Sequence, residues 1–109
     1  MKGRPLDTEP AEFGEIARRL KDHYGAQRVW LFGSRAKGTA DEDSDIDLLV
    51  VSPVSEGFFQ RMASVRRLLR DCRAGGPISP IVLTPQELQA RIEKGDQFIG
   101  DILANGVEL

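Results

Sequence analysis

The chain is poor in the residues that build disulfides and histidine sites: it has one cysteine and one histidine in 109 residues. Cys72 alone can form no internal disulfide and no cysteine-based zinc site, which fits a reducing, cytoplasmic compartment. His23 gives little support to histidine-rich metal sites or to histidine-dependent acid–base catalysis. The N-terminus lacks the apolar segment of a signal peptide, and no window approaches the roughly 18 apolar residues of a membrane span.

An excess of charge of one sign is also absent. Lys and Arg total 15 and Asp and Glu total 17, for a net charge of -2. This balance argues against a protein that coats DNA, because such affinity comes from excess positive charge. Five arginines of the second expected helix are interpreted as its solvent-exposed face. The alternative interpretation is that they form a surface for RNA or for an acidic partner. They are Arg61, Arg66, Arg67, Arg70 and Arg73.

The size and composition of the chain are those of one small globular domain. Its mass is 12.1 kDa, and 40% of its residues are hydrophobic and 29% charged, which indicates a folded chain with one modest core. We expect residues 1–8 to be a disordered N-terminus and residues 9–109 to form a single domain.

Hydrophobic periodicity predicts an α/β domain with the order helix, strand, strand, helix, strand, helix, helix. Spacings of three and four predict helices over residues 9–24, 57–72, 85–94 and 96–104. Runs rich in branched and aromatic residues predict strands over 28–32, 45–51 and 78–83. Pro80 places the last strand at an edge or a bulge. Thr84 and Glu87 fit a capping box. The last helix is expected to carry inward its residues Phe98, Ile99, Ile102 and Leu103.

Two aspartates begin the second expected strand. Asp45 and Asp47 should project from the same face, with Cα atoms roughly 6–7 Å apart. Two ionised carboxylates this close repel each other, and burial increases the cost, so we expect a cation to offset them. Mg²⁺ is the expected cation, because it takes carboxylate and phosphate oxygens. The alternative is a pair of solvated acids at a strand end.

A glycine–serine pair directly follows the first expected strand. Gly33 allows a sharp turn and close approach of a ligand to the main chain. If Ser34 opens a short helix over 34–37, its free amides form a phosphate site, with Arg35 and Lys37 near enough to assist. Alone, this pair would be an ordinary turn. A phosphate cradle beside a carboxylate pair on the neighbouring strand describes a nucleotidyl-transfer centre.

The two pairs together form the pattern G-S-x10-D-x-D, from Gly33 to Asp47. This pattern resembles the nucleotidyltransferase superfamily typified by DNA polymerase beta, and the stretch GSRAKGTADEDSDIDLLVV is similar to the signature of its minimal nucleotidyltransferase group. The resemblance, over roughly residues 11–109, implies a small mixed sheet with helices on one side. It implies that Asp45 and Asp47 are catalytic and bind the metal. The nucleotide-binding residues implied are Gly33, Ser34, Arg35, Lys37 and Ser44.

The resemblance also implies an activity and a partner. Members bind Mg²⁺ and a nucleoside triphosphate, for which ATP is expected here, and transfer a nucleotide to a hydroxyl. Many minimal nucleotidyltransferases are the antitoxin half of a pair with a helical HEPN-type toxin, which they silence by binding it or by adenylylating a tyrosine. We expect such a partner, or a second copy of the chain as a homo-dimer, beside the open acceptor side of the site.

One position departs from the family pattern. The family run resembles D-I-V-V-L-T-P, whereas this chain has S-P-I-V-L-T-P, so Ser79 stands where a third carboxylate is expected. That carboxylate completes the metal site and helps to remove the proton of the attacking hydroxyl, and a serine is a poor base. Asp71 or a residue of a partner is a candidate substitute. Two interpretations stay open: an enzyme with weakened transfer, and a nucleotide-binding antitoxin that acts only by binding its toxin.

Overall fold

The structure is a computed structural model that describes residues 11–40, 44–72 and 77–109. The predicted segment 1–8 lies outside these residues. The predicted order of elements is confirmed, with a short helix where Ser34 was expected to open one. The elements are α1 (Ala11–His23), β1 (Arg28–Phe32), α2 (Ser34–Lys37), β2 (Ile46–Val51), α3 (Phe58–Leu68), β3 (Ile78–Leu83), α4 (Pro85–Glu93), α5 (Gln97–Asn105) and β4 (Val107–Glu108).

The four strands form one mixed sheet in the order β3-β2-β1-β4. β1 pairs antiparallel with β2 and β4, and β2 pairs parallel with β3. Pro80 therefore lies in an edge strand, as predicted, where a missing amide costs no ladder bond on the open side. The sequence analysis missed β4, because a strand of two residues has no periodicity to detect.

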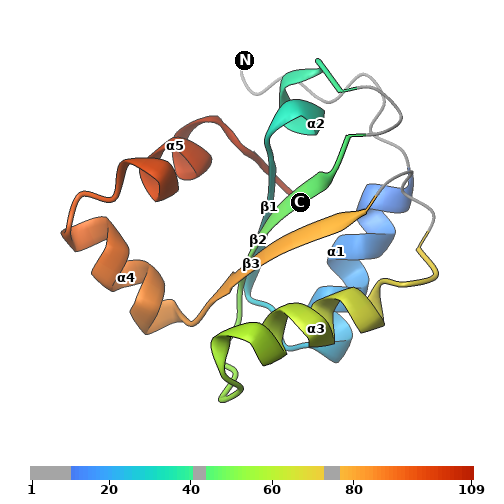
Figure 1. Cartoon of the computed structure of the whole chain (residues 1–109), viewed down its shortest axis with the longest axis horizontal. Coiled ribbons are helices and arrows are strands. Elements are labelled where there is room, and N and C mark those ends of the chain that lie inside the picture. Colours follow the sequence, from blue (N-terminus) through green and yellow to red (C-terminus); the bar gives the residue numbers. More distant parts are fainter. Residues whose placement is uncertain (1–10, 41–43, 73–76) are drawn as a thin grey trace.

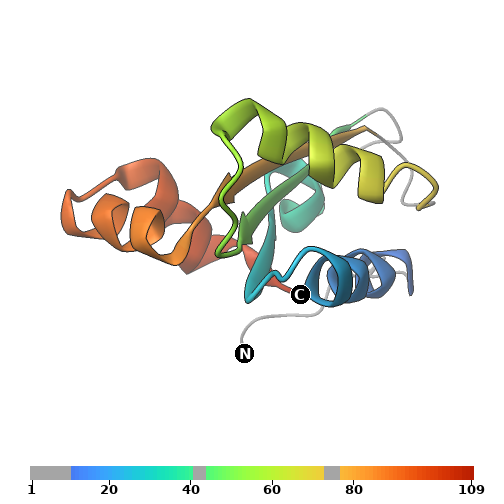
Figure 2. The same ribbon diagram turned by 90° about the horizontal axis from the view of Figure 1, so that it is seen from below.

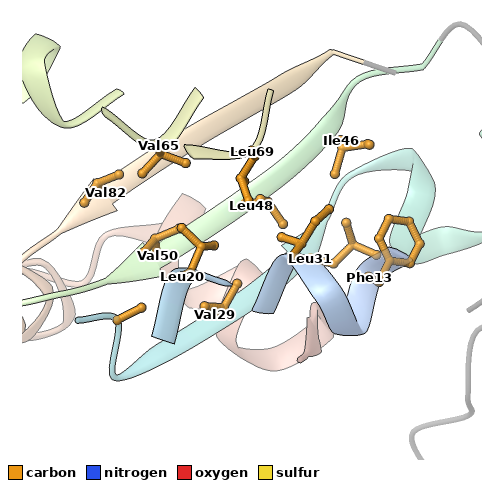
Figure 3. Packing of buried hydrophobic residues seen from close by; sticks show 12 residues of the cluster. Phe13, Leu20, Val29, Leu31, Ile46, Leu48, Val50, Val65, Leu69 and Val82 are labelled. Atoms are coloured by element: carbon orange, nitrogen blue, oxygen red, sulfur yellow. The ribbon is translucent and has the colours of Figure 1, made fainter. Parts of the chain in front are cut away.

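One face of the sheet is covered by α1 and α3 (Figures 1 and 2). Alternate residues of β2 point to this face, and they pack against the apolar side of each helix, as Figure 3 shows for Leu48 and Leu69. The spacing of three and four in α1 is thus explained by burial against the strands. The buried residues of this core are Phe13, Ile16, Leu20, Ala26, Val29, Leu31, Ile46, Leu48, Val50, Val65, Leu69 and Val82.

The other face of the sheet is partly covered by α5, which lies with α4 on the side opposite α1 and α3 (Figures 1 and 2). Ile99 and Ile102 pack there against Trp30, Leu49 and Leu83. The mixed α/β class is confirmed. The expected one-sided layer of helices describes α1 and α3, and α5 adds a second layer because the intervening residues of β2 are apolar too.

Phe98 corrects one expectation for α5. It was predicted to face inward with Ile99, but its side chain is 52% exposed. Its ring meets that of Phe32 edge to face, with centroids 5.7 Å apart. Neighbouring residues differ by about 100° around a helix axis, and here Ile99 takes the buried position while Phe98 lies at the edge of the buried face. Phe98 lies at the margin of the core, next to open space.

Arg61 corrects a second expectation, because it is buried and does not lie on a solvent-exposed helix face. Its side chain donates to the carboxylate of Glu87 at 2.6 Å and to the backbone oxygens of Glu56 and Val82. Glu87 also completes the predicted capping box with Thr84. A buried guanidinium that is fully engaged in this way joins α3 to the start of α4. Three of the other arginines are exposed, as predicted: Arg66, Arg67 and Arg70.

Histidine, tryptophan and cysteine each occur once in the chain. His23 is exposed, and Trp30 is buried in the core with the guanidinium of Arg28 over its ring. Cys72 is half-buried against the core, and burial raises the pKa of its thiol. In the described part of the chain, no helix is long and apolar enough to cross a membrane.

Candidate active site

A line of three paired residues crosses the sheet at one end of β2. Asp47 is paired with Phe32 of β1 on one side and with Ser79 of β3 on the other. Residues paired across neighbouring strands point to the same face of a sheet. The three side chains therefore lie on the face that α5 partly covers, in the order Ser79, Asp47, Phe32.

The start of α2 is in direct contact with this line. Gly33 precedes α2 with φ 76° and ψ -157°, a conformation that is essentially restricted to glycine. A Cβ atom at this position would lie 2.2 Å from Oδ2 of Asp47, so the carboxylate would have to move to make room for it. The chain therefore needs glycine here for two independent reasons. The main chain of the glycine–serine turn packs against the second aspartate, which explains why the two pairs of the motif occur together.

The two aspartates differ in their surroundings. Asp45 is exposed just before β2, whereas Asp47 is half-buried within the strand. Burial, and after it the charge of Asp45, raises the pKa of Asp47 above its ordinary value. The electrostatic cost expected for this pair is thus present in the structure. Both carboxylates offer oxygen ligands to a hard cation from one end of β2.

Ser79 lies beside the carboxylates. Its hydroxyl donates a hydrogen bond of 3.1 Å to Oδ2 of Asp45, and its backbone is paired with Asp47. A side chain at this position therefore reaches the pair, as the third carboxylate of the family would. The carboxylate of Asp71 instead accepts a hydrogen bond from Arg19 of α1, the helix on the opposite face of the sheet. Within the described residues, no three His, Cys, Asp or Glu side chains gather as a metal-binding group.

The other predicted nucleotide-binding residues lie on or next to α2. Arg35 donates a hydrogen bond of 2.9 Å to the backbone oxygen of Ser44, so α2 is tied to the segment that leads into β2. Ser34 begins α2 directly beside Gly33, and Lys37 ends it with an exposed side chain. Four of the five predicted residues thus lie within Gly33–Lys37, and the fifth, Ser44, is joined to them through Arg35. The acidic run 41–43 lies outside the described residues.

A cleft of about 220 Å³ opens between α2 and α5, and sequence reasoning missed it. Its lining includes Phe32, Gly33, Lys37, Phe98, Asp101 and Asn105. The three residues from α5 are spaced by three and four, which places them on one helix face. That spacing was the available signal, and it was hidden by the expectation that Phe98 points into the core.

The fold and the site define a class of protein. A small mixed sheet that places a glycine–serine turn against a D-x-D pair is typical of the polymerase beta-like nucleotidyltransferases. The sequence profile described as "Nucleotidyltransferase domain" matches residues 14–103, and the chain belongs to this family.

Two relatives agree with this assignment. A protein of Methanocaldococcus jannaschii named "putative protein adenylyltransferase" is 35% identical over an alignment of 85 residues that covers 71% of this chain and 56% of that protein. A crystal structure of a "putative nucleotidyltransferase" from Sulfolobus solfataricus superimposes with a TM-score of 0.54 and 30% identity, over 73% of this chain and 70% of that one. The chain thus spans about half the length of the adenylyltransferase relative.

Proposed function

We propose that this nucleotidyltransferase domain binds a nucleoside triphosphate, ATP by expectation, together with Mg²⁺, and transfers the nucleotidyl group to a hydroxyl of a protein or other acceptor. The observation that supports it most is the contact between the Gly33 backbone and the Asp47 carboxylate, which sets a phosphate-accessible turn against a cation-binding group. The adenylyltransferase name of the relative from Methanocaldococcus jannaschii favours AMP as the group transferred.

The residues present fit a divalent cation. Asp45 and Asp47 would hold it, because they supply carboxylate oxygens at one end of β2, and a cation would relieve the repulsion that raises the pKa of Asp47. The bound ion supplies charge neutralisation to the triphosphate. Ser79 adds a hydroxyl oxygen next to Asp45, with no charge of its own.

The chain's own residues supply the positioning. The glycine at position 33 lets phosphate oxygens approach the main chain, and the Ser34 hydroxyl and the Arg35 guanidinium lie on the adjacent turn. In the reaction the acceptor oxygen forms a bond to the α-phosphorus, and the bond to the β-phosphate bridging oxygen breaks. Pyrophosphate leaves with that electron pair. The proton of the acceptor hydroxyl passes to solvent water, because Ser79, the residue on that side of Asp47, is a poor base.

A second function is favoured by Ser79 itself. Because its hydroxyl is a poor base, the same site can hold a nucleotide and yet transfer slowly. The chain would then act as an antitoxin that binds a helical HEPN-type toxin. We also propose that the chain forms a homo-dimer and is cytoplasmic. The exposed arginines of α3 would provide a contact for RNA.

Titration calorimetry with Mg²⁺ and ATP tests the binding on which both functions depend. We expect heat of binding that corresponds to a dissociation constant well below millimolar. This binding should be lost when EDTA removes the metal. Incubation with α-labelled ATP and the toxin co-purified with this chain then separates the two functions. Label on the toxin supports the enzyme, and a tight complex without label supports the binder. The absence of any binding up to the millimolar range contradicts both.

The pH dependence of metal binding follows from the raised pKa of Asp47. The cation binds the ionised carboxylate, so affinity for Mg²⁺ should decrease as pH falls through this pKa. Because the pKa is raised, the decrease should begin at a higher pH than for an ordinary aspartate. Calorimetry at pH values from neutral to about 4.5 measures it. Asp45→Asn removes the neighbouring charge, so the midpoint of its profile should move to lower pH. An unmoved midpoint would show that Asp45 does not act on Asp47.

A further inference from the structure

The cleft between α2 and α5 borders the line of paired residues formed by Ser79, Asp47 and Phe32. Phe32, which is paired with Asp47, lines the cleft, and so does Gly33, which touches the Asp47 carboxylate. A molecule in the cleft would therefore lie directly beside the glycine–serine turn at Gly33, which is the proposed phosphate turn. Ser79 lies on the opposite side of Asp47, in edge strand β3.

The volume of the cleft matches a part of a nucleotide. Its 220 Å³ is below the roughly 300–1,000 Å³ of sites that enclose a complete drug-sized ligand. One wall is aromatic: Phe98 stands at 84° to the ring of Phe32, which supports its edge and leaves the side chain 52% exposed. A supported, half-exposed ring offers a face on which a nucleobase can stack.

The other α5 residues of the lining, Asp101 and Asn105, offer the cleft a hydrogen-bond acceptor. The amide of Asn105 donates to Oδ1 of Asp101 at 2.7 Å, which fixes the carboxylate and leaves its second oxygen as an acceptor. Acceptors of this kind match the hydroxyls of a ribose, which are donors. Lys37 of α2 also lines the cleft and adds a positive charge to it.

We propose that this cleft holds the nucleoside of the triphosphate, with the base stacked on Phe98 and the ribose hydroxyls donating to Asp101. The proposal rests on the proposed function, and it assigns the two sides of the site. The nucleoside lies on the β1 side of Asp47, and the acceptor hydroxyl enters from the β3 side, over Ser79.

The test compares two ligands, Mg-ATP and Mg-tripolyphosphate, by calorimetry on the intact chain. Phe98→Ala should weaken ATP binding about 10-fold or more, the expected loss of one base–aromatic stack, and leave tripolyphosphate binding unchanged. Asp101→Ala should weaken ATP binding and remove the preference for ATP over its 2′,3′-dideoxy analogue. Phe59→Ala is the matched control, because Phe59 lies on α3, is 80% exposed, and is not part of the cleft.

The outcomes distinguish a failure of this proposal from a failure of the proposed nucleotide function on which it rests. If the unaltered chain binds ATP and tripolyphosphate but Phe98→Ala binds ATP as tightly as before, the cleft does not hold the nucleoside. Equal losses for both ligands in Phe98→Ala also overturn the assignment, because they indicate damage to the phosphate turn. If the unaltered chain binds neither ligand, the nucleotide function itself is wrong.

Discussion

Asp47→Asn is expected to reduce nucleotidyl transfer by a factor on the order of 10²–10³, the scale of losing one electrostatic contact to the reacting phosphate. Asparagine keeps the size of the side chain but removes the charge that binds the cation. The change should also abolish the magnesium dependence of ATP binding. The measurements are the rate of label transfer from α-labelled ATP and calorimetry with and without Mg²⁺.

The same substitution should not destabilise the fold, which distinguishes it from unfolding. The folded-state pKa of Asp47 lies above its ordinary value because of burial and then Asp45. Ionisation therefore costs folding free energy as pH rises through the window between the ordinary and the raised pKa. At neutral pH and without Mg²⁺, Asp47→Asn removes this cost. We expect its melting temperature to equal or exceed that of the unaltered chain.

Asp71→Asn is the matched control, and its effects should have the opposite pattern. The hydrogen bond from Arg19 lowers the pKa of Asp71, so its ionised form stabilises the fold above the ordinary pKa. The asparagine variant should lose a little stability at neutral pH and keep full transfer activity. If Asp71→Asn lost transfer as strongly as Asp47→Asn, the assignment of the catalytic carboxylates would be wrong.

Local signals in the sequence were sufficient to predict the helices and strands that carry the candidate site. Thr84, Pro85 and Glu87 predicted the start of α4 because a capping box satisfies its own backbone groups within four residues. The run of branched apolar residues in β2 predicted one strand with carboxylates at its beginning. The glycine–serine and D-x-D pairs predicted a joint site because their spacing matches a family, and the clash at Gly33 now gives the physical reason.

The features that were missed depend on contacts between distant elements. The burial of Arg61 follows from a glutamate 26 residues away, which no periodicity in α3 reveals. The cleft exists because β4 returns α5 to the edge of β1, and β4 is too short to predict. Phe98 was placed inward because apolar character alone does not distinguish a core position from the wall of a cleft.

Ser79→Asp is expected to raise the rate of transfer by a factor on the order of 10²–10⁴, the usual contribution of one positioned general base. The position is suitable, because the Ser79 hydroxyl already reaches Oδ2 of Asp45 at 3.1 Å and its backbone is paired with Asp47. A carboxylate there adds a ligand for the cation and an acceptor for the proton of the attacking hydroxyl. The rate of label transfer from α-labelled ATP to a protein that co-purifies with the chain measures the gain.

Stability without metal provides an independent measurement on the same variant. A third carboxylate beside Asp45 and Asp47 adds repulsion, so Ser79→Asp should melt at a lower temperature than the unaltered chain, and Mg²⁺ should restore the difference. Ser79→Asn is the control, because it has the size of aspartate without the charge and should show neither the gain nor the metal-dependent rescue. If Ser79→Asp shows the rescue by Mg²⁺ but no faster transfer, the proton is not removed at this position. The acceptor or its carrier protein must then supply the base.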